Sequence, residues 1–351
     1  MSKAIVCSIS SVVSRICDVG GWLDTWFAKY GEVLNLGVYS AYFGSEAPFR
    51  GIEVLVNEKK LSGSEKMIRI YAADPSYDIE LKISDLVKGR FDQKNLLLAT
   101  LYLLRNRLEV GESDLDIRIC SPIPPGASMG TSASISVALT KAICGRSINN
   151  DTAAQMAWRA ETEIMGGQSG TQDQYAAAYS RGAHFLTVDY PQTRVEVVNI
   201  PVNVKKSLES GLITVFYGQH SSFSSHRRVI KELENEGPQS PRLENLRGLA
   251  RKARECILSS DLEGFGTIMS QNTEAQGKLY HGIISNSAQS IIKLAGEYCA
   301  LGYKINGAGG SGGSVTILFG SDLNARNFYV ACQEKYSPRL GFKYFKHKFP
   351  V

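Results

Sequence analysis

The sequence predicts an α+β fold built from two domains. Alternating apolar and polar residues, which are typical of half-buried strands, recur at 52–56, 67–71, 79–83 and 115–119. Between them, the leucines at 97, 101, 104 and 108 are spaced four, three and four residues apart, which places them on one stripe of a helix. Strands and helices therefore mix in irregular order, which is the pattern of an α+β protein.

The middle of the chain continues this mixture. Apolar residues at helical spacing predict a helix that begins near Ser132 and ends at Gly145, where a glycine supplies a stop. A second helix is predicted over 153–165, ending at Gly166 and Gly167. Three apolar runs then predict strands at 183–189, 195–200 and 212–217.

The last third is mainly helical. Apolar stripes predict helices over 243–253 and 284–295, whereas the polar segment 232–241, with two prolines, predicts a surface loop. At 351 residues the chain is longer than one ordinary hydrophobic core requires. We therefore expect two domains, 1–205 and 206–351, with a ligand cleft between them.

Composition excludes several classes of protein. The net charge is +5 and the charges are spread along the chain, so the basic stripe of a nucleic-acid-binding protein is missing. No apolar run is long enough for a membrane span and no secretory signal is recognisable, so we expect a cytoplasmic protein. The seven cysteines form no CxxC pair, and the five histidines lack metal-ligand spacing, which argues against a disulfide framework and a zinc site.

The segment 121–134 (SPIPPGASMGTSAS) leads from a predicted strand directly into a helix. Small residues let backbone N–H groups approach an anion, and the helix N-terminus adds unpaired donors and a favourable dipole. The hydroxyls of Thr131 and Ser132 are available to a phosphate oxygen or Mg²⁺. No lysine follows Gly130, so the segment is not a Walker P-loop. The alternative is a Ser/Thr-capped helix after a proline turn.

The segment 158–179 (WRAETEIMGGQSGTQDQYAAAY) carries three acids. Glu161 and Glu163 point about 200° apart on a helix, so at most one of them faces a site. Asp173 follows a glycine-rich turn, where a carboxylate beside a phosphate site can orient or deprotonate an acceptor hydroxyl. The alternative is that all three are solvated surface charges.

The glycine cluster at 304–314 (KINGAGGSGGS) is followed at once by the β-type run 315–319. A dinucleotide-binding loop runs from a strand into a helix, so a nicotinamide-dependent oxidoreductase is the weaker interpretation. A glycine-rich hairpin that closes over a ligand fits better, and a structural turn is the alternative.

Together with 14–24 (SRICDVGGWLD), these segments resemble the signature set of the GHMP kinases, which include galactokinase, homoserine kinase, mevalonate kinase and phosphomevalonate kinase. The phosphate loop of that family usually reads PPGAGLGSSAS, and 124–134 read PPGASMGTSAS. The resemblance implies a two-domain fold: an N-terminal mixed β-sheet domain with helices carries the phosphate loop, and the C-terminal domain is ferredoxin-like α+β. It also implies ATP and Mg²⁺ as cofactors.

The same resemblance assigns roles residue by residue. Asp173 and Arg15 correspond to the catalytic aspartate and to an arginine near the transferring phosphate, and Ser132 and Glu161 to the Mg²⁺-binding pair. Asp24 resembles the acid that hydrogen-bonds sugar hydroxyls. The nucleotide loop would comprise Pro125, Gly126, Ala127, Ser128, Met129, Gly130, Thr131, Ser132 and Ala133, and the substrate would also meet Gly20, Gly21, Trp22, Gly307, Gly309 and Gly310.

Within the family, GGWLDTWFAKYGEVLNLGV and GGQSGTQDQYAAAYSRGAHF look most like the D-glycero-D-manno-heptose 7-phosphate kinases, with glucuronate and fucose kinases next. This implies phosphorylation of an anomeric hydroxyl to give the 1,7-bisphosphate. A sugar phosphate needs a second anion site, for which Arg227 and Arg228 in 220–228 are candidates, although adjacent arginines are commonly surface residues. We expect a monomer or homodimer with a small-molecule partner. A non-catalytic sugar-phosphate-binding descendant of the fold is the alternative of a different class.

Overall fold

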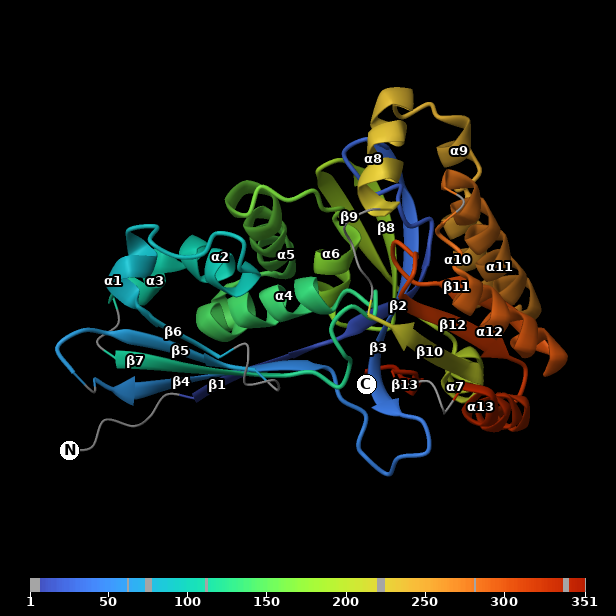
Figure 1. Ribbon diagram of the computed structural model, residues 1–351, viewed down its shortest axis with the longest axis horizontal. Coiled ribbons are helices and arrows are strands. Elements are labelled where there is room, and N and C mark those ends of the chain that lie inside the picture. Colours follow the sequence, from blue (N-terminus) through green and yellow to red (C-terminus); the bar gives the residue numbers. More distant parts are fainter. Residues whose placement is uncertain are drawn as a thin grey trace.

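The computed structural model describes residues 7–61, 63–72, 78–110, 113–219, 225–280, 282–336 and 341–350. Two β-sheets and the helices that cover them make up this part of the chain (Figure 1). The α+β prediction is confirmed. No helix within these ranges is both long and apolar enough to cross a lipid bilayer.

The first sheet has five strands in the order β1-β4-β7-β5-β6, and only the β5–β7 pair is parallel. Its strands are β1 (Cys7–Val12), β4 (Ile52–Lys60), β5 (Met67–Tyr71), β6 (Ile79–Lys82) and β7 (Ser113–Cys120). Figure 1 shows the helices of this half gathered on one face of the sheet. They are α1 (Ile83–Val87), α2 (Leu96–Leu103), α3 (Arg105–Val110), α4 (Thr131–Cys144), α5 (Asn150–Arg159) and α6 (Gln172–Tyr179). The leucine stripe is thus divided between α2 and α3, which meet at Leu104.

The second sheet joins the two halves of the chain. It has eight strands in the order β11-β12-β10-β13-β3-β8-β9, and β2 pairs with β3. The strands are β2 (Ser14–Val19), β3 (Tyr30–Tyr42), β8 (Ala183–Asp189), β9 (Gln192–Val198), β10 (Leu212–Gly218), β11 (Ala300–Ile305), β12 (Gly313–Phe319) and β13 (Lys343–Lys348). Phe345 on β13 pairs with Tyr42 on β3, and this pairing joins the C-terminal strands to the N-terminal strands in one sheet. The expected boundary at 205/206 falls inside helix α7 (Val202–Gly211) rather than in a linker.

The C-terminal helices correct one expectation. They are α8 (Ser225–Glu236), α9 (Pro241–Glu244), α10 (Leu249–Leu258), α11 (Leu262–Leu279), α12 (Asn286–Glu297) and α13 (Asp322–Tyr336). The loop predicted at 232–241 is wrong in its first half, because α8 continues to Glu236. Leu233 is fully buried, and Arg242 forms ion pairs with Glu232 and Glu236 across the turn, so burial and charge pairing hold this polar segment in a helix.

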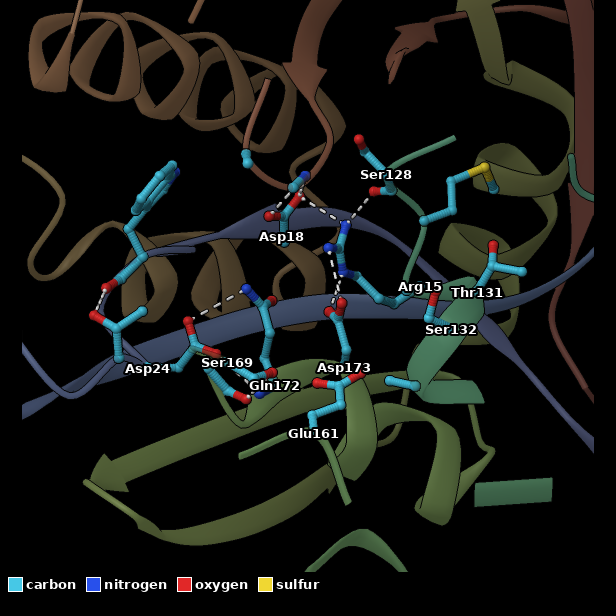
Figure 2. Close-up of a pocket in the computed structure, with 18 of the residues that line it drawn as sticks. Arg15, Asp18, Asp24, Ser128, Thr131, Ser132, Glu161, Ser169, Gln172 and Asp173 are labelled. Carbon is cyan, nitrogen blue, oxygen red and sulfur yellow. Dashed lines mark hydrogen bonds and ion pairs between the residues drawn. The ribbon is translucent and has the colours of Figure 1, made fainter. Parts of the chain in front are cut away.

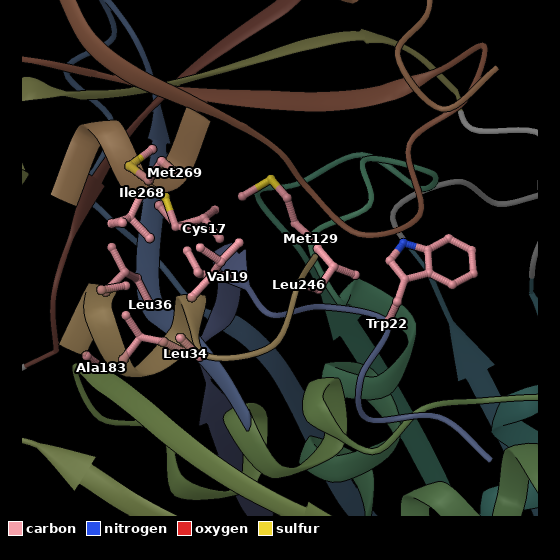
Figure 3. Close-up of a cluster of buried hydrophobic side chains, with 14 of the residues drawn as sticks. Cys17, Val19, Trp22, Leu34, Leu36, Met129, Ala183, Leu246, Ile268 and Met269 are labelled. Atoms are coloured by element: carbon pink, nitrogen blue, oxygen red, sulfur yellow. The ribbon is translucent and has the colours of Figure 1, made fainter. Parts of the chain in front are cut away.

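A hydrophobic core connects the N-terminal strands with the C-terminal helices. Figure 3 shows Leu34 and Leu36 on β3 in one cluster with Cys17 and Val19 on β2 and with Ile268 and Met269 on α11. Met129, from the segment predicted to bind phosphate, belongs to the same buried cluster and is fully buried. Because this side chain is anchored in the core, the loop that carries it is fixed relative to both halves of the chain.

Candidate active site

A cleft of about 470 Å³ lies where segments that are distant in sequence meet. Figure 2 shows side chains from β2, from the turn before α4 and from the start of α6 pointing into it. The contributing segments are 15–27, 126–133, 161–173 and 307–308, together with Gln219 and Ile230. The three chemistry-bearing segments of the sequence and the N-terminal segment are therefore brought together at one site.

The turn before α4 offers backbone amides to a ligand. Gly130 is the N-cap of α4 with φ of 69°, and no side chain caps the helix. The alternative of a Ser/Thr-capped helix is therefore wrong, and the first amides of α4 are left for another acceptor. The buried Oγ1 of Thr131 also lacks a hydrogen-bond partner. Ser128 adopts φ of 57°, a left-handed conformation that the glycine usual at this position adopts without strain. Pro125 lies outside the cleft lining.

Arg15 and Asp173 form a close pair beside this turn. Arg15 Nε donates to Asp173 Oδ1 at 2.6 Å, and Nη2 donates to Oδ2 at 3.3 Å. Arg15 Nη1 donates to the carbonyl oxygen of Ser128 at 2.7 Å, which ties the guanidinium to the turn. Burial lowers the pKa of Arg15, but the carboxylates of Asp173 and Asp18 more than offset it and hold the pKa above its ordinary value. Arg15 is therefore a permanent cation at the base of the cleft.

Asp24 is buried against the start of α6. Its Oδ2 accepts from the backbone N–H groups of Thr171 and Gln172 at 2.8 and 2.9 Å, and its Oδ1 lies 3.4 Å from Gln172 Nε2. A Cβ on Gly170 would lie 2.2 Å from Asp24 Oδ2, so glycine is required for this close approach. Burial, with a smaller contribution from the charge of Asp173, raises the pKa of Asp24 to about 6, although the backbone hydrogen bonds oppose this. Asp24 Oδ1 and the unpartnered Gln172 Oε1 are acceptors available to a hydroxyl group.

Glu161 faces the cleft and Glu163 does not, as the helical spacing predicts. Residues 160–164 form a π-helical turn after α5, a feature that is frequent at functional sites. Glu161 is half-buried and accepts from Gln174 Nε2 at 2.9 Å, whereas Glu163 is exposed and pairs with Arg159. Loss of hydration raises the pKa of Glu161 to about 7, with a further contribution from the charge of Asp173.

The donor set suits magnesium bound together with phosphate. No group of three His, Cys, Asp or Glu side chains that could hold a metal ion occurs within the ranges that the structure describes. Mg²⁺ commonly uses one or two carboxylates and completes its shell with substrate phosphates and water. Ser132 and Glu161 both line the cleft next to the uncapped start of α4, and this arrangement fits such a site.

The predicted substrate glycines divide into two groups. Gly307 lines the cleft, as does Trp22. Gly309 and Gly310 do not line it: a Cβ on Gly309 would meet the carbonyl oxygen of Ile283 at 2.6 Å, and Gly310 N donates to the same oxygen at 2.8 Å. Gly20 and Gly21 also lie outside the lining. A Cβ on Gly20 would lie 2.2 Å from the carbonyl oxygen of Glu32, so this glycine permits close packing of the turn against β3.

The expected second anion site falls largely outside the described residues. This holds for 220–224 and for the side chains of His226 and Arg228. Arg227 is exposed on α8, the helix whose Ile230 lines the cleft. Among the lining residues that the structure describes, Arg15 is the one cation.

Sequence reasoning missed several polar residues of the cleft, among them Asp18 and Gln172. Asp18 lies three residues after Arg15, and its carboxylate oxygen is 3.5 Å from Arg15 Nη1. Gln172 directly precedes Asp173. Adjacency to a selected residue could have found Gln172, which stands with Asp173 at the start of α6. Asp18 shares strand β2 with Arg15, and its approach to the guanidinium follows from the fold.

Replacement of Asp24 by Asn should stabilise the protein at neutral pH. Because the pKa of Asp24 in the fold lies above its ordinary 3.8, ionisation lowers the free energy of unfolding as pH rises from about 4 through about 6. Asn cannot ionise, and its Oδ1 can still accept the two backbone amides. We expect Asp24→Asn to raise the free energy of unfolding, measured with urea, by about 2 to 3 kcal/mol at pH 7.5 and to leave it unchanged below pH 4. The exposed Asp189→Asn is the control, and an Asp24→Asn protein that is less stable at pH 7.5 would contradict the burial argument.

The chain has matches among protein families and known proteins. The GHMP kinases N terminal domain matches residues 95–181 and the GHMP kinases C terminal domain matches 253–338. The bifunctional fucokinase/GDP-fucose pyrophosphorylase of Arabidopsis thaliana is 26% identical over 86% of this chain, which spans 29% of that protein. The mevalonate kinase of Pyrococcus horikoshii is 25% identical over 80% of this chain and 84% of its own length. In fold, a D-glycero-D-manno-heptose 1-phosphate kinase structure from Bacteriodes thetaiotaomicron aligns with a TM-score of 0.68 at 16% identity, covering 98% of each chain.

Fold and family matches thus define a protein of the small-molecule kinase class, whose cleft has a turn of small residues at a helix N-terminus and a carboxylate beside it. The chain belongs to the GHMP kinase superfamily. The predicted family and fold are therefore confirmed.

Proposed function

We propose that this protein transfers the γ-phosphoryl group of ATP to a hydroxyl group of a sugar. The observation that carries the proposal is the Arg15–Asp173 pair, whose Nε and Oδ1 atoms lie 2.6 Å apart next to the uncapped start of α4. A Cβ on Gly130 would lie 3.2 Å from both Arg15 Cγ and Asp173 Cγ, so the pair is in contact with the turn itself. Phosphate, cation and carboxylate would thus meet within one small volume.

In the proposed mechanism, positioning and electrostatics provide most of the catalysis. The amides of 126–133 hold the triphosphate, and Arg15 balances charge on the transferring oxygens. Asp173 orients the acceptor hydroxyl and accepts its proton as the new P–O bond forms and the bond from the γ-phosphorus to ADP breaks. Ser132 and Glu161 would hold Mg²⁺, which neutralises charge on the phosphates when bound.

The first acceptor we propose is D-glycero-D-manno-heptose 7-phosphate, phosphorylated at its anomeric hydroxyl. The resemblance of 20–38 and 166–185 to heptose kinases favours it. It requires a cation for the 7-phosphate besides Arg15, and Arg227 with Arg228 on α8 are the candidates.

A sugar without a phosphate group, such as fucose, is the second acceptor class, and glucuronate is a further candidate from the sequence. Two observations favour a neutral sugar. Arg15 is the one cation among the described residues that line the cleft, and it already serves Asp173 and Asp18. The fucokinase similarity covers 86% of this chain.

An ADP-release assay with Mg-ATP against heptose 7-phosphate, glucuronate, fucose, galactose and mevalonate tests the function. Turnover with any sugar supports the proposed kinase activity. Absence of turnover with every acceptor, despite ATP binding, favours a non-catalytic sugar-binding protein. If heptose 7-phosphate is the substrate, Arg227→Ala/Arg228→Ala should raise its KM about 10- to 100-fold with little change in kcat, because each lost arginine–phosphate contact weakens binding. Lys231→Ala, an exposed charge on the same helix, is the matched control. An unchanged KM would remove these arginines from the site.

A further inference from the structure

A chain of charged side chains runs along the cleft, from a buried lysine in the C-terminal half of the protein to the half-buried Asp173. Its members are Lys304 on β11, Asp18 and Arg15 on β2, and Asp173 at the start of α6. Figure 2 shows Asp18, Arg15 and Asp173 linked in this order by dashed contacts. The mechanism proposed above uses Arg15 and Asp173 and leaves Lys304 and Asp18 without a role.

Lys304 is completely buried, which is rare for a lysine and costly unless the charge is compensated. Its Nζ lies 3.4 Å from Asp18 Oδ1 and donates to Gln276 Oε1 at 2.8 Å and to the carbonyl oxygen of Ile305. Gln276 in turn donates to the carbonyl oxygen of Gly307 at 2.6 Å. Lys304 therefore contacts Asp18 directly and, through Gln276, contacts the glycine loop, which comprises residues 307–313.

Asp18 connects three structural elements through one carboxylate. Gly307 N lies 3.1 Å from both of its oxygens, and its Oδ1 is also 3.5 Å from Arg15 Nη1. Lys304 and Arg15 thus share Asp18 Oδ1, and two cations balance the charges of Asp18 and Asp173. Neighbouring contacts lock the same junction, since Asn306 Oδ1 accepts from Cys17 N at 3.0 Å and Ser314 Oγ donates to the carbonyl oxygen of Ala127 at 2.6 Å.

We propose that Lys304 and Asp18 are positioning residues that set the orientation of Arg15, and through it of Asp173, relative to the glycine loop. The inference rests on the proposed kinase function. Lys304 compensates Asp18, so Asp18 anchors Gly307 while leaving the guanidinium of Arg15 paired with Asp173. Without Lys304, Asp18 has Arg15 as its nearest remaining cation and draws it away from Asp173.

The test compares Lys304→Met, Asp18→Asn and the double variant with wild type. Removal of Lys304 alone leaves two carboxylates, those of Asp18 and Asp173, to share Arg15, whereas the double variant removes both charges and keeps an oxygen at position 18 for Gly307 N. We expect each single variant to lower kcat at least about tenfold, with ATP affinity within about threefold of wild type. The double variant should exceed Lys304→Met in kcat by about threefold or more. Lys278→Met, an exposed lysine on α11, is the control.

A second readout needs no turnover. Hydrogen exchange at the Gly307 amide, followed in peptides that contain it, should accelerate at least about tenfold in Lys304→Met, because Lys304 fixes both Asp18 and Gln276, which hold this residue. Asp18→Asn keeps an oxygen for the amide and should accelerate its exchange less. If wild type phosphorylates no acceptor, the proposed function fails and exchange alone decides this inference. Unchanged exchange, or kcat within twofold of wild type in a folded Lys304→Met protein, overturns it. If Lys304→Met does not fold, kcat of Asp18→Asn decides the question. That variant should fold, because burial lowers the pKa of Lys304 and so favours its neutral form once Asp18 is gone.

Discussion

Asp173→Asn is expected to lower kcat by about 10²- to 10⁴-fold while ATP binding stays the same or tightens slightly. The variant keeps the shape of the side chain but cannot accept a proton from the acceptor hydroxyl, a contribution of this size in general-base catalysis. It also removes the negative partner of Arg15, whose Nε lies 2.6 Å from Asp173 Oδ1. The cation is then balanced less fully, which favours an anionic nucleotide. Single-turnover kinetics with the active acceptor, together with ATP titration, measures the two effects separately.

Glu163→Gln provides the matched control for this substitution. Glu163 lies ten residues earlier, is exposed and pairs with Arg159 outside the cleft. Its kcat should match that of wild type. If Asp173→Asn retains more than about a tenth of wild-type kcat, Asp173 is not the base and the assignment of the mechanism fails.

The sequence predicted most elements and the three segments of the cleft because their signals are local. Alternation located β5 and an apolar run located β8 to the residue, and the glycine at 145 marked the end of α4. The turn before α4 was also predictable, because its small residues stand directly before a helical pattern. In each case neighbours in sequence fix the conformation.

The features that were not predicted depend on contacts between distant residues. Lys304 and Asp18 stand 286 positions apart, and a solitary lysine or aspartate in a strand usually faces solvent. Gly309 and Gly310 could not be separated from Gly307, because only the packing of the loop on Ile283 turns them away from the cleft. Similarly, the helical conformation of 232–236 depends on Arg242 and on burial of Leu233.

Gly130→Ala should lower kcat/KM for ATP by about 100-fold, because the added methyl group would press on Arg15 and Asp173, the proposed catalytic residues. The new Cβ would lie 3.2 Å from Arg15 Cγ, 3.2 Å from Asp173 Cγ and 3.4 Å from Asp173 Oδ2, in a site where displacement of about 1 Å is costly. The left-handed φ of 69° adds a backbone cost of about 1 to 2 kcal/mol to folding. Steady-state kinetics and urea unfolding report the two losses independently.

Gly248→Ala separates backbone strain from crowding of the site. Gly248 is also the N-cap of a helix, α10, with a comparable left-handed φ of 77°, but no heavy atom lies within 4 Å of the position of its Cβ. We expect it to lose a similar amount of stability and to keep wild-type kcat/KM. Equal loss of activity in both variants would show that helix stability, rather than the Arg15–Asp173 contact, limits catalysis. If only Gly130→Ala loses activity, the turn, Arg15 and Asp173 act together in catalysis. Their short mutual distances lead us to expect this result.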